Sequence, residues 1–162
     1  GVYSFKDMKV VFMDPSVDRD FSPEWSPNNK KVAFIRKPYA KDVPPFSPQK
    51  SARPWSIRVI NLSSGQSKSL WEADPGRGSA FFNQFPRAAL KWTIDNQLIF
   101  PWEKNGWMHL YSLDVQSGNT SQLTYGDGIV EQYHLNKENN YILYTTNVND
   151  IHARHILSLI HI

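Results

Sequence analysis

The chain has 162 residues, of which 40% are hydrophobic and 14% aromatic, so its composition excludes a disordered polymer. The formal net charge of +3 is spread along the sequence instead of forming one basic stripe, so nucleic acid is not expected as a partner. Cysteine is absent, which excludes disulfides, thiolate metal sites and a cysteine nucleophile.

Short apolar segments separated by turn residues predict β-strands throughout, because no segment shows a sustained helical period. Residues 2–14 are expected to form one or two strands. The next four strands are predicted at residues 24–26, 32–36, 56–61 and 67–71. A second set of four is predicted at residues 90–93, 97–102, 108–114 and 120–124. A third set begins with strands at residues 130–135 and 141–146.

These sets form a loose internal repeat, in which a polar turn always follows the first strand. Turns at residues 27–30, 95–96 and 137–140 contain Asn or Asp, which tolerate the positive backbone angles of tight hairpins. Four short strands in a period of about 40–50 residues are typical of a β-propeller blade. The sequence therefore predicts an all-β fold: a partial β-propeller with about two complete four-stranded antiparallel blades and incomplete flanking blades.

The predicted blades belong to one domain, residues 1–156. Its blade pieces are expected at residues 1–17, 18–71, 88–124 and 129–156. Aromatic residues at matching or neighbouring blade positions are expected to be packing residues: Trp25, Trp92, Tyr133, Trp107 and Tyr111.

Two long irregular segments, residues 37–54 and 72–87, are predicted to lie on one rim of the propeller, opposite the short turns. Long loops on a rigid scaffold often carry binding sites. Arg53, Arg77 and Arg87 lie in these loops and are the candidates for substrate-facing residues, because a guanidinium can bind a peptide carbonyl or carboxylate. The alternative is that each arginine pairs with an adjoining domain or is simply solvated.

No catalytic residue is predicted. A serine hydrolase of the α/β type needs a Gly-x-Ser-x-Gly segment, which the sequence lacks, and Ser79 is interpreted as a glycine-rich loop residue. His152 and His155 straddle a predicted hairpin and do not form a metal-ligand pattern. No cofactor or metal is expected, and no apolar stretch reaches the about 18–20 residues of a membrane helix.

Several segments resemble a known family. WSPNNKKVAFIR resembles a blade signature shared by Tol-system propellers and the propellers of prolyl oligopeptidase-type serine peptidases. The ordered succession of residues 107–111, 123–124, 146–147 and 154–156 most resembles the N-terminal region of dipeptidyl peptidase IV. The resemblance covers roughly residues 18–156. Residues 157–162 depart from the family pattern and are interpreted as a non-native or truncated tail.

The resemblance implies a non-catalytic propeller fragment of a serine exopeptidase or oligopeptidase that acts in proteolysis. Its implied partners are a C-terminal α/β-hydrolase domain absent from this chain, peptide substrates that the propeller gates and positions, and a second copy in a homodimer. A periplasmic or extracellular location is favoured. The alternative is a non-enzymatic Tol-like periplasmic propeller that binds protein partners. The 67-residue spacing between Trp25 and Trp92, wider than in uniform blades, favours the peptidase interpretation.

Overall fold

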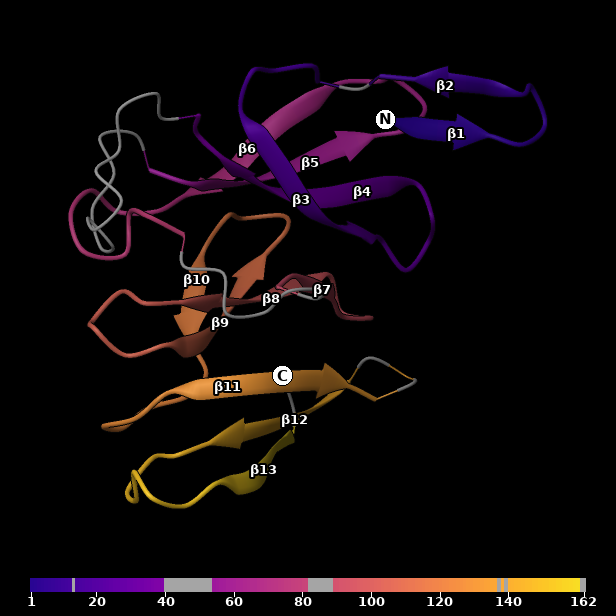
Figure 1. The fold of residues 1–162 in the computed structure, drawn as a ribbon. Coiled ribbons are helices and arrows are strands. Elements are labelled where there is room, and N and C mark those ends of the chain that lie inside the picture. The colour runs from indigo at the N-terminus through magenta and orange to yellow at the C-terminus, as the bar shows by residue number, and fades with distance from the viewer. Residues whose placement is uncertain (13, 40–53, 82–88, 137, 139, 161–162) are drawn as a thin grey trace.

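The computed structural model describes residues 1–12, 14–39, 54–81, 89–136, 138 and 140–160, and within them every regular element is a β-strand. The strands form antiparallel sheets that follow one another along the chain (Figure 1). A hairpin comes first, with strands β1 (Val2–Ser4) and β2 (Lys9–Val11). We call the three larger sheets blades B, C and D.

Each blade pairs its strands in sequence order, as a propeller blade does. Blade B contains β3 (Arg19–Trp25), β4 (Lys31–Lys37), β5 (Ser56–Asn61) and β6 (Ser67–Glu72). Blade C contains β7 (Lys91–Trp92), β8 (Gln97–Trp102), β9 (His109–Asp114) and β10 (Thr120–Gln122). Blade D contains β11 (Val130–Leu135), β12 (Tyr141–Thr146) and β13 (His155–Ile160). The predicted partial propeller with two complete four-stranded blades is confirmed.

The hairpin turns follow the local sequence. Asn29 and Asn96 adopt positive φ angles of 55° and 60° in the turns after β3 and β7. Asparagine is one of the few residues that accept this left-handed conformation at low cost. The corresponding turn of blade D lies partly outside the described residues.

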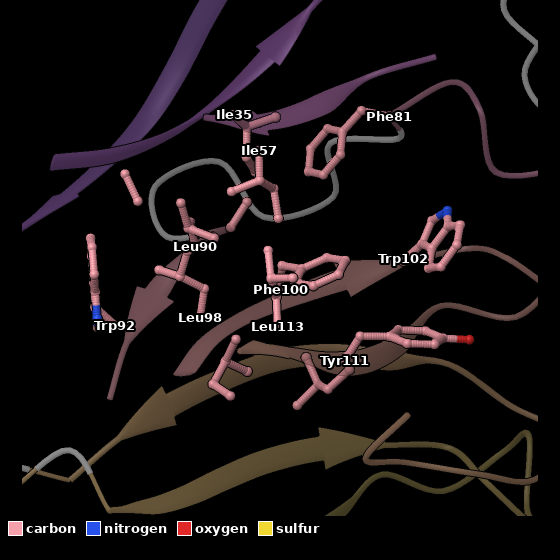
Figure 2. Packing of buried hydrophobic residues seen from close by; sticks show 14 of the residues in the cluster. Ile35, Ile57, Phe81, Leu90, Trp92, Leu98, Phe100, Trp102, Tyr111 and Leu113 are labelled. Carbon is pink, nitrogen blue, oxygen red and sulfur yellow. The ribbon is translucent and has the colours of Figure 1, made fainter. Parts of the chain in front are cut away.

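Blade C lies between blades B and D, and the core is continuous through all three (Figure 1). Figure 2 shows Ile35 and Ile57 of blade B facing Leu90, Leu98 and Phe100. On the opposite face of blade C, Val130, Tyr133 and Ile142 of blade D complete the cluster. The Tyr133 hydroxyl donates a hydrogen bond of 3.0 Å to the carbonyl of Ile99.

Not every expected packing residue is buried. Trp92, Tyr111 and Tyr133 are buried as predicted, but Trp25 and Trp107 are 51% and 42% exposed, so that prediction was wrong for these two. Trp25 pairs with Val32 on the face of blade B that is turned away from blade C, where its ring is only partly covered. Trp107 precedes β9 in a surface turn.

On the face of blade B that is turned away from blade C, here called the outer face, a cluster of charged and polar groups connects the blade to the N-terminal segment. The Asp14 carboxylate accepts hydrogen bonds from Arg58 Nε at 2.6 Å and from Ser67 Oγ at 2.7 Å, and it lies 3.2 Å from Arg36 Nη1. Arg36 also donates to both carboxylate oxygens of Asp20, at 2.7 and 2.8 Å. The Arg36 side chain is only 9% exposed, so these partners compensate a largely buried charge.

The pKa of Asp14 lies below its ordinary value of 3.8. Burial acts to raise it, but the hydrogen bonds from Ser67 and Arg58 and the charges of both arginines outweigh that effect. A carboxylate whose pKa is depressed on folding stabilises the fold above its unfolded-state pKa. That stabilisation is lost as the pH falls through the folded-state pKa.

We expect Asp14→Asn to lower the free energy of unfolding near pH 7 by about 1–3 kcal/mol, because two arginines lose their shared anion. The difference between wild type and variant should shrink below about pH 4, where Asp14 is protonated in the unfolded state. Urea unfolding followed by tryptophan fluorescence measures both effects. Asp127→Asn is the control, since Asp127 is exposed; equal losses in the two variants would contradict the prediction.

Candidate functional site: the rim that carries the long connections

The strand ends that are joined by the connections β4–β5, β6–β7 and β8–β9 lie on one rim of the blades, because neighbouring strands are antiparallel. Hydrogen bonds between consecutive connections tie this rim together. The amide of Val130 donates to the carbonyl of Met108 at 2.8 Å, and that of Asn147 donates to Ile129. The described part of the β6–β7 connection, residues 73–81, lies on the same rim. We call this surface the loop rim.

One carbonyl group anchors the β6–β7 connection to its two neighbours. The Gly78 carbonyl oxygen accepts a hydrogen bond from the indole nitrogen of Trp55 and another from that of Trp102, both at 2.9 Å. Trp55 immediately precedes β5 of blade B, and Trp102 ends β8 of blade C. Gly78 therefore joins two blades and a long loop at one buried point.

Gly78 also satisfies a steric requirement. Its φ angle is +78°, and a Cβ atom added there would lie 2.7 Å from Trp102 Nε1 and 2.9 Å from the carbonyl oxygen of Glu103. Both distances are shorter than a side chain can tolerate, and one of them involves backbone. Only glycine therefore lets the loop approach the next blade this closely.

The two tryptophans that bind the Gly78 carbonyl belong to a larger aromatic cluster. Trp55 packs edge-on against Trp71 and Phe81, with centroid separations of 4.8 and 4.7 Å. Trp71 packs in the same way against Trp102 at 4.8 Å, and Trp102 packs against Tyr111 at 5.1 Å. Edge-to-face pairs of this kind add about 0.5–1.5 kcal/mol each beyond the burial of their area. The cluster thus stabilises the packing around the Gly78 carbonyl group.

The Tyr111 hydroxyl is buried in this cluster without a hydrogen-bond partner among the described residues. Burial raises the pKa of this hydroxyl, and the nearby Tyr125 acts in the same direction. His109, on the same strand, is also buried and lies 3.2 Å through Nδ1 from the Thr124 hydroxyl. Burial lowers the pKa of His109, which favours the neutral ring. Both groups are structural parts of the blade.

Charged groups form the exposed layer of the loop rim. Arg77 is exposed and its guanidinium lies against the backbone of Gly106, since a Cβ atom there would be 2.6 Å from Arg77 Nη1. Burial raises the pKa of the neighbouring Glu103, while the charge of Arg77 acts to lower it. Lys104 lies over the ring of Trp102 at 4.8 Å and pairs with Asp74 at 2.9 Å.

Of the three arginines predicted to face a substrate, the structure places Arg77 on the loop rim, and Arg53 and Arg87 lie outside the described residues. Ser79 is fully buried, and its hydroxyl donates to the Gly76 carbonyl at 2.6 Å, which agrees with its interpretation as a loop residue. No cluster of metal-ligating side chains occurs in the described part of the chain.

The sequence interpretation missed the joint role of Trp55, Gly78 and Trp102. A signal was present: each tryptophan stands next to a proline at a strand end, and Gly78 lies in a Gly-Arg-Gly segment. The described rim offers cations, carboxylates and aromatic rings that can bind polar ligands. The described residues contain no helix that is long and apolar enough to span a membrane.

Four-stranded antiparallel sheets stacked through a common core, with long connections on one rim, define a protein of the β-propeller class. Residues 57–159 match the family model for the dipeptidyl peptidase IV (DPP IV) N-terminal region. The chain belongs to this family. Among curated protein sequences, none matches the chain significantly.

Several solved structures share the fold. TolB from Acinetobacter baumannii is 20% identical, with a TM-score of 0.58 over 87% of this chain and 29% of TolB. An oligogalacturonate lyase in complex with manganese is 11% identical, with a TM-score of 0.64 over 89% of this chain and 39% of the lyase. A puromycin hydrolase variant complexed with PGG is 15% identical, with a TM-score of 0.54 over 85% of this chain and 20% of the hydrolase. The chain thus spans less than half of each protein, and these identities show the fold alone.

We expect Gly78→Ala to destabilise the fold by about 1–3 kcal/mol more than Gly65→Ala does, because the added methyl group collides with Trp102 and the Glu103 backbone. Gly65 is the matched control: its φ angle is +67° and no atom lies within 4 Å of an added Cβ. Both variants share the left-handed strain, of about 1–2 kcal/mol, so only the contact differs. Urea unfolding at one pH measures the difference, and equal destabilisation would contradict the anchoring role.

Proposed function

We propose that this chain is the non-catalytic propeller portion of a serine exopeptidase or oligopeptidase. Its role is to gate and position peptide substrates for a C-terminal α/β-hydrolase domain that lies outside this chain. The observation that carries the proposal is the family match over residues 57–159, which identifies the propeller as a dipeptidyl peptidase IV N-terminal region. The proposal requires no metal or cofactor in the propeller.

The loop rim has the properties that substrate positioning requires. Its base is held by the two indole bonds to Gly78 and by the aromatic cluster, so the exposed groups stand on a rigid support. A peptide offers carbonyl oxygens and a terminal carboxylate, for which a guanidinium is a fitting partner. We therefore retain Arg77 as a substrate-facing residue, together with Arg53 and Arg87 in the same long connections.

The partners follow from the same proposal. The hydrolase domain would adjoin the loop rim, peptides would pass between the two, and a homodimer and a periplasmic or extracellular location are further expectations. The domain is proposed to comprise residues 1–156, as expected from the sequence, although the family match extends to residue 159 and so includes part of the expected tail, residues 157–162. Within the structure the last strand of blade D, β13, continues to Ile160 and pairs with β12 along its length.

The gene that encodes this chain should continue into a strand–turn–helix segment with a Gly-x-Ser-x-Gly motif, followed by Asp and His. The full-length protein is expected to cleave chromogenic dipeptide substrates, and replacement of the serine of that motif by alanine should abolish cleavage. Sequencing downstream and a release assay check both expectations. Lack of the motif within about 400 residues, at the scale of one or two domains, would refute the peptidase assignment.

In the full-length protein, Arg77→Ala should raise KM for peptide substrates about five- to tenfold and leave kcat within twofold, as expected when a contact contributes equally to ground state and transition state. Initial rates over a range of substrate concentrations separate the two constants. Lys30→Ala, on the opposite rim, is the control and should change neither constant. An unchanged KM in the Arg77 variant would assign Arg77 to loop docking against Gly106 instead.

A Tol-like binding propeller is the second candidate, and the similarity of the fold to TolB favours it. Such a protein would present its rim to protein partners and have no hydrolase domain. The two candidates give opposite results in the cleavage assay of the full-length protein.

A further inference from the structure

A cavity of about 540 Å³, with both polar and apolar lining, opens on the rim opposite to the long connections. It is formed by the ends of β4, β5 and β6 of blade B and by the β5–β6 turn, and all of its lining residues are described. The polar side chains that line it belong to Lys31, Asn61, Ser64, Gln66, Ser67 and Lys68. No residue of the loop rim contributes to it.

Strand register places the two lysines on one face of the sheet, on either side of β5. Lys31 pairs with Asn61 across β4 and β5, and Lys68 pairs with Val59 across β5 and β6. Residues 59 and 61 lie two apart on one strand, so their side chains and those of their partners share a face. Strands β4 and β6 are about 10 Å apart across β5. Two long lysine side chains can therefore approach one small ligand from both sides.

The lining offers hydrogen-bond donors and no carboxylate. Neither Lys31 nor Lys68 forms an ion pair with any acidic group among the described residues. The carbonyl oxygen of the Asn61 side chain already accepts from the amide and the hydroxyl of Ser63, at 3.0 and 2.7 Å. This orients the donor NH₂ group of Asn61 away from Ser63.

One carboxylate lies nearby, and its charge is compensated. The Ser67 hydroxyl donates to Asp14, but that carboxylate is already paired with Arg36 and Arg58 on the outer face of the blade. The cavity therefore combines two uncompensated ammonium groups with amide donors. Such a set of donors favours an anion with several acceptor oxygens over a cation or a neutral apolar ligand.

We infer that this cavity binds a small oxyanion, with Lys31 and Lys68 as its charged ligands and the side-chain amides of Asn61 and Gln66 as further donors. The site is independent of the loop rim and of the peptidase assignment. A phosphate, a sulfate and a carboxylate group share the required chemistry, and the experiment below distinguishes them.

Equilibrium dialysis of the 162-residue chain against radiolabelled sulfate at constant ionic strength tests the site, because dialysis measures binding whatever the association state of the chain. We expect saturable binding of one sulfate per chain, with Kd raised about tenfold by Lys31→Gln or by Lys68→Gln, since each removes one charge-assisted contact. Lys30→Gln is the matched control: Lys30 neighbours Lys31 in sequence but does not line the cavity. Its Kd should stay within twofold of the wild type.

Competition identifies the kind of oxyanion. Displacement of sulfate by inorganic phosphate but not by acetate assigns a tetrahedral anion, and displacement by acetate at comparable concentration assigns a carboxylate. Uptake that rises linearly without saturation, or equal Kd values in all three lysine variants, overturns the inference. Far-UV circular dichroism checks that each variant is folded. If Lys31→Gln perturbs its strand, Lys68→Gln still tests the site, because Lys68 is exposed and its replacement should not affect the fold.

Discussion

Burial of blade C on both faces is the constraint on which the rest of the structure depends. Leu98, Ile99 and Phe100 are consecutive in β8 and all fully buried, although successive side chains of a strand point to opposite faces. Blade C is therefore stable only with a sheet on either side, and blades B and D provide them. Stacking of this kind fixes the order of the blades and brings their connections to common rims.

The loop rim depends on that stacking through a single glycine. Residues 55 and 102 belong to different blades, and their indoles meet at the Gly78 carbonyl only because the two sheets are packed face to face. The bonds satisfy two buried donors that would otherwise cost free energy. They also fix the positions of the exposed charges of Arg77 and Lys104 and of the half-buried Glu103. The blades and the candidate binding surface are thus connected by the same hydrogen bonds.

The fold does not by itself assign an activity. Similar folds occur in a TolB, in an oligogalacturonate lyase and in a puromycin hydrolase, so the shared blades are compatible with different chemistries. The family match assigns the chain to the dipeptidyl peptidase IV N-terminal region, and the proposed peptidase role would be carried out on the loop rim. The oxyanion cavity lies on the opposite rim and would give the propeller a second, separate binding surface.

Local sequence determined the strands, the asparagine turns and the antiparallel order of the blades, because alternation of apolar residues and turn chemistry act over a few residues. It also indicated which rim carries the long connections. Only the tertiary structure decided which distant groups meet. Asp14 accepts hydrogen bonds from Arg36 and Arg58, which follow it by 22 and 44 residues in the sequence. The Gly78 carbonyl accepts hydrogen bonds from two indoles that belong to different blades. The exposure of Trp25 and Trp107 also depends on which surfaces the neighbouring elements cover. Residue spacing alone does not specify those surfaces.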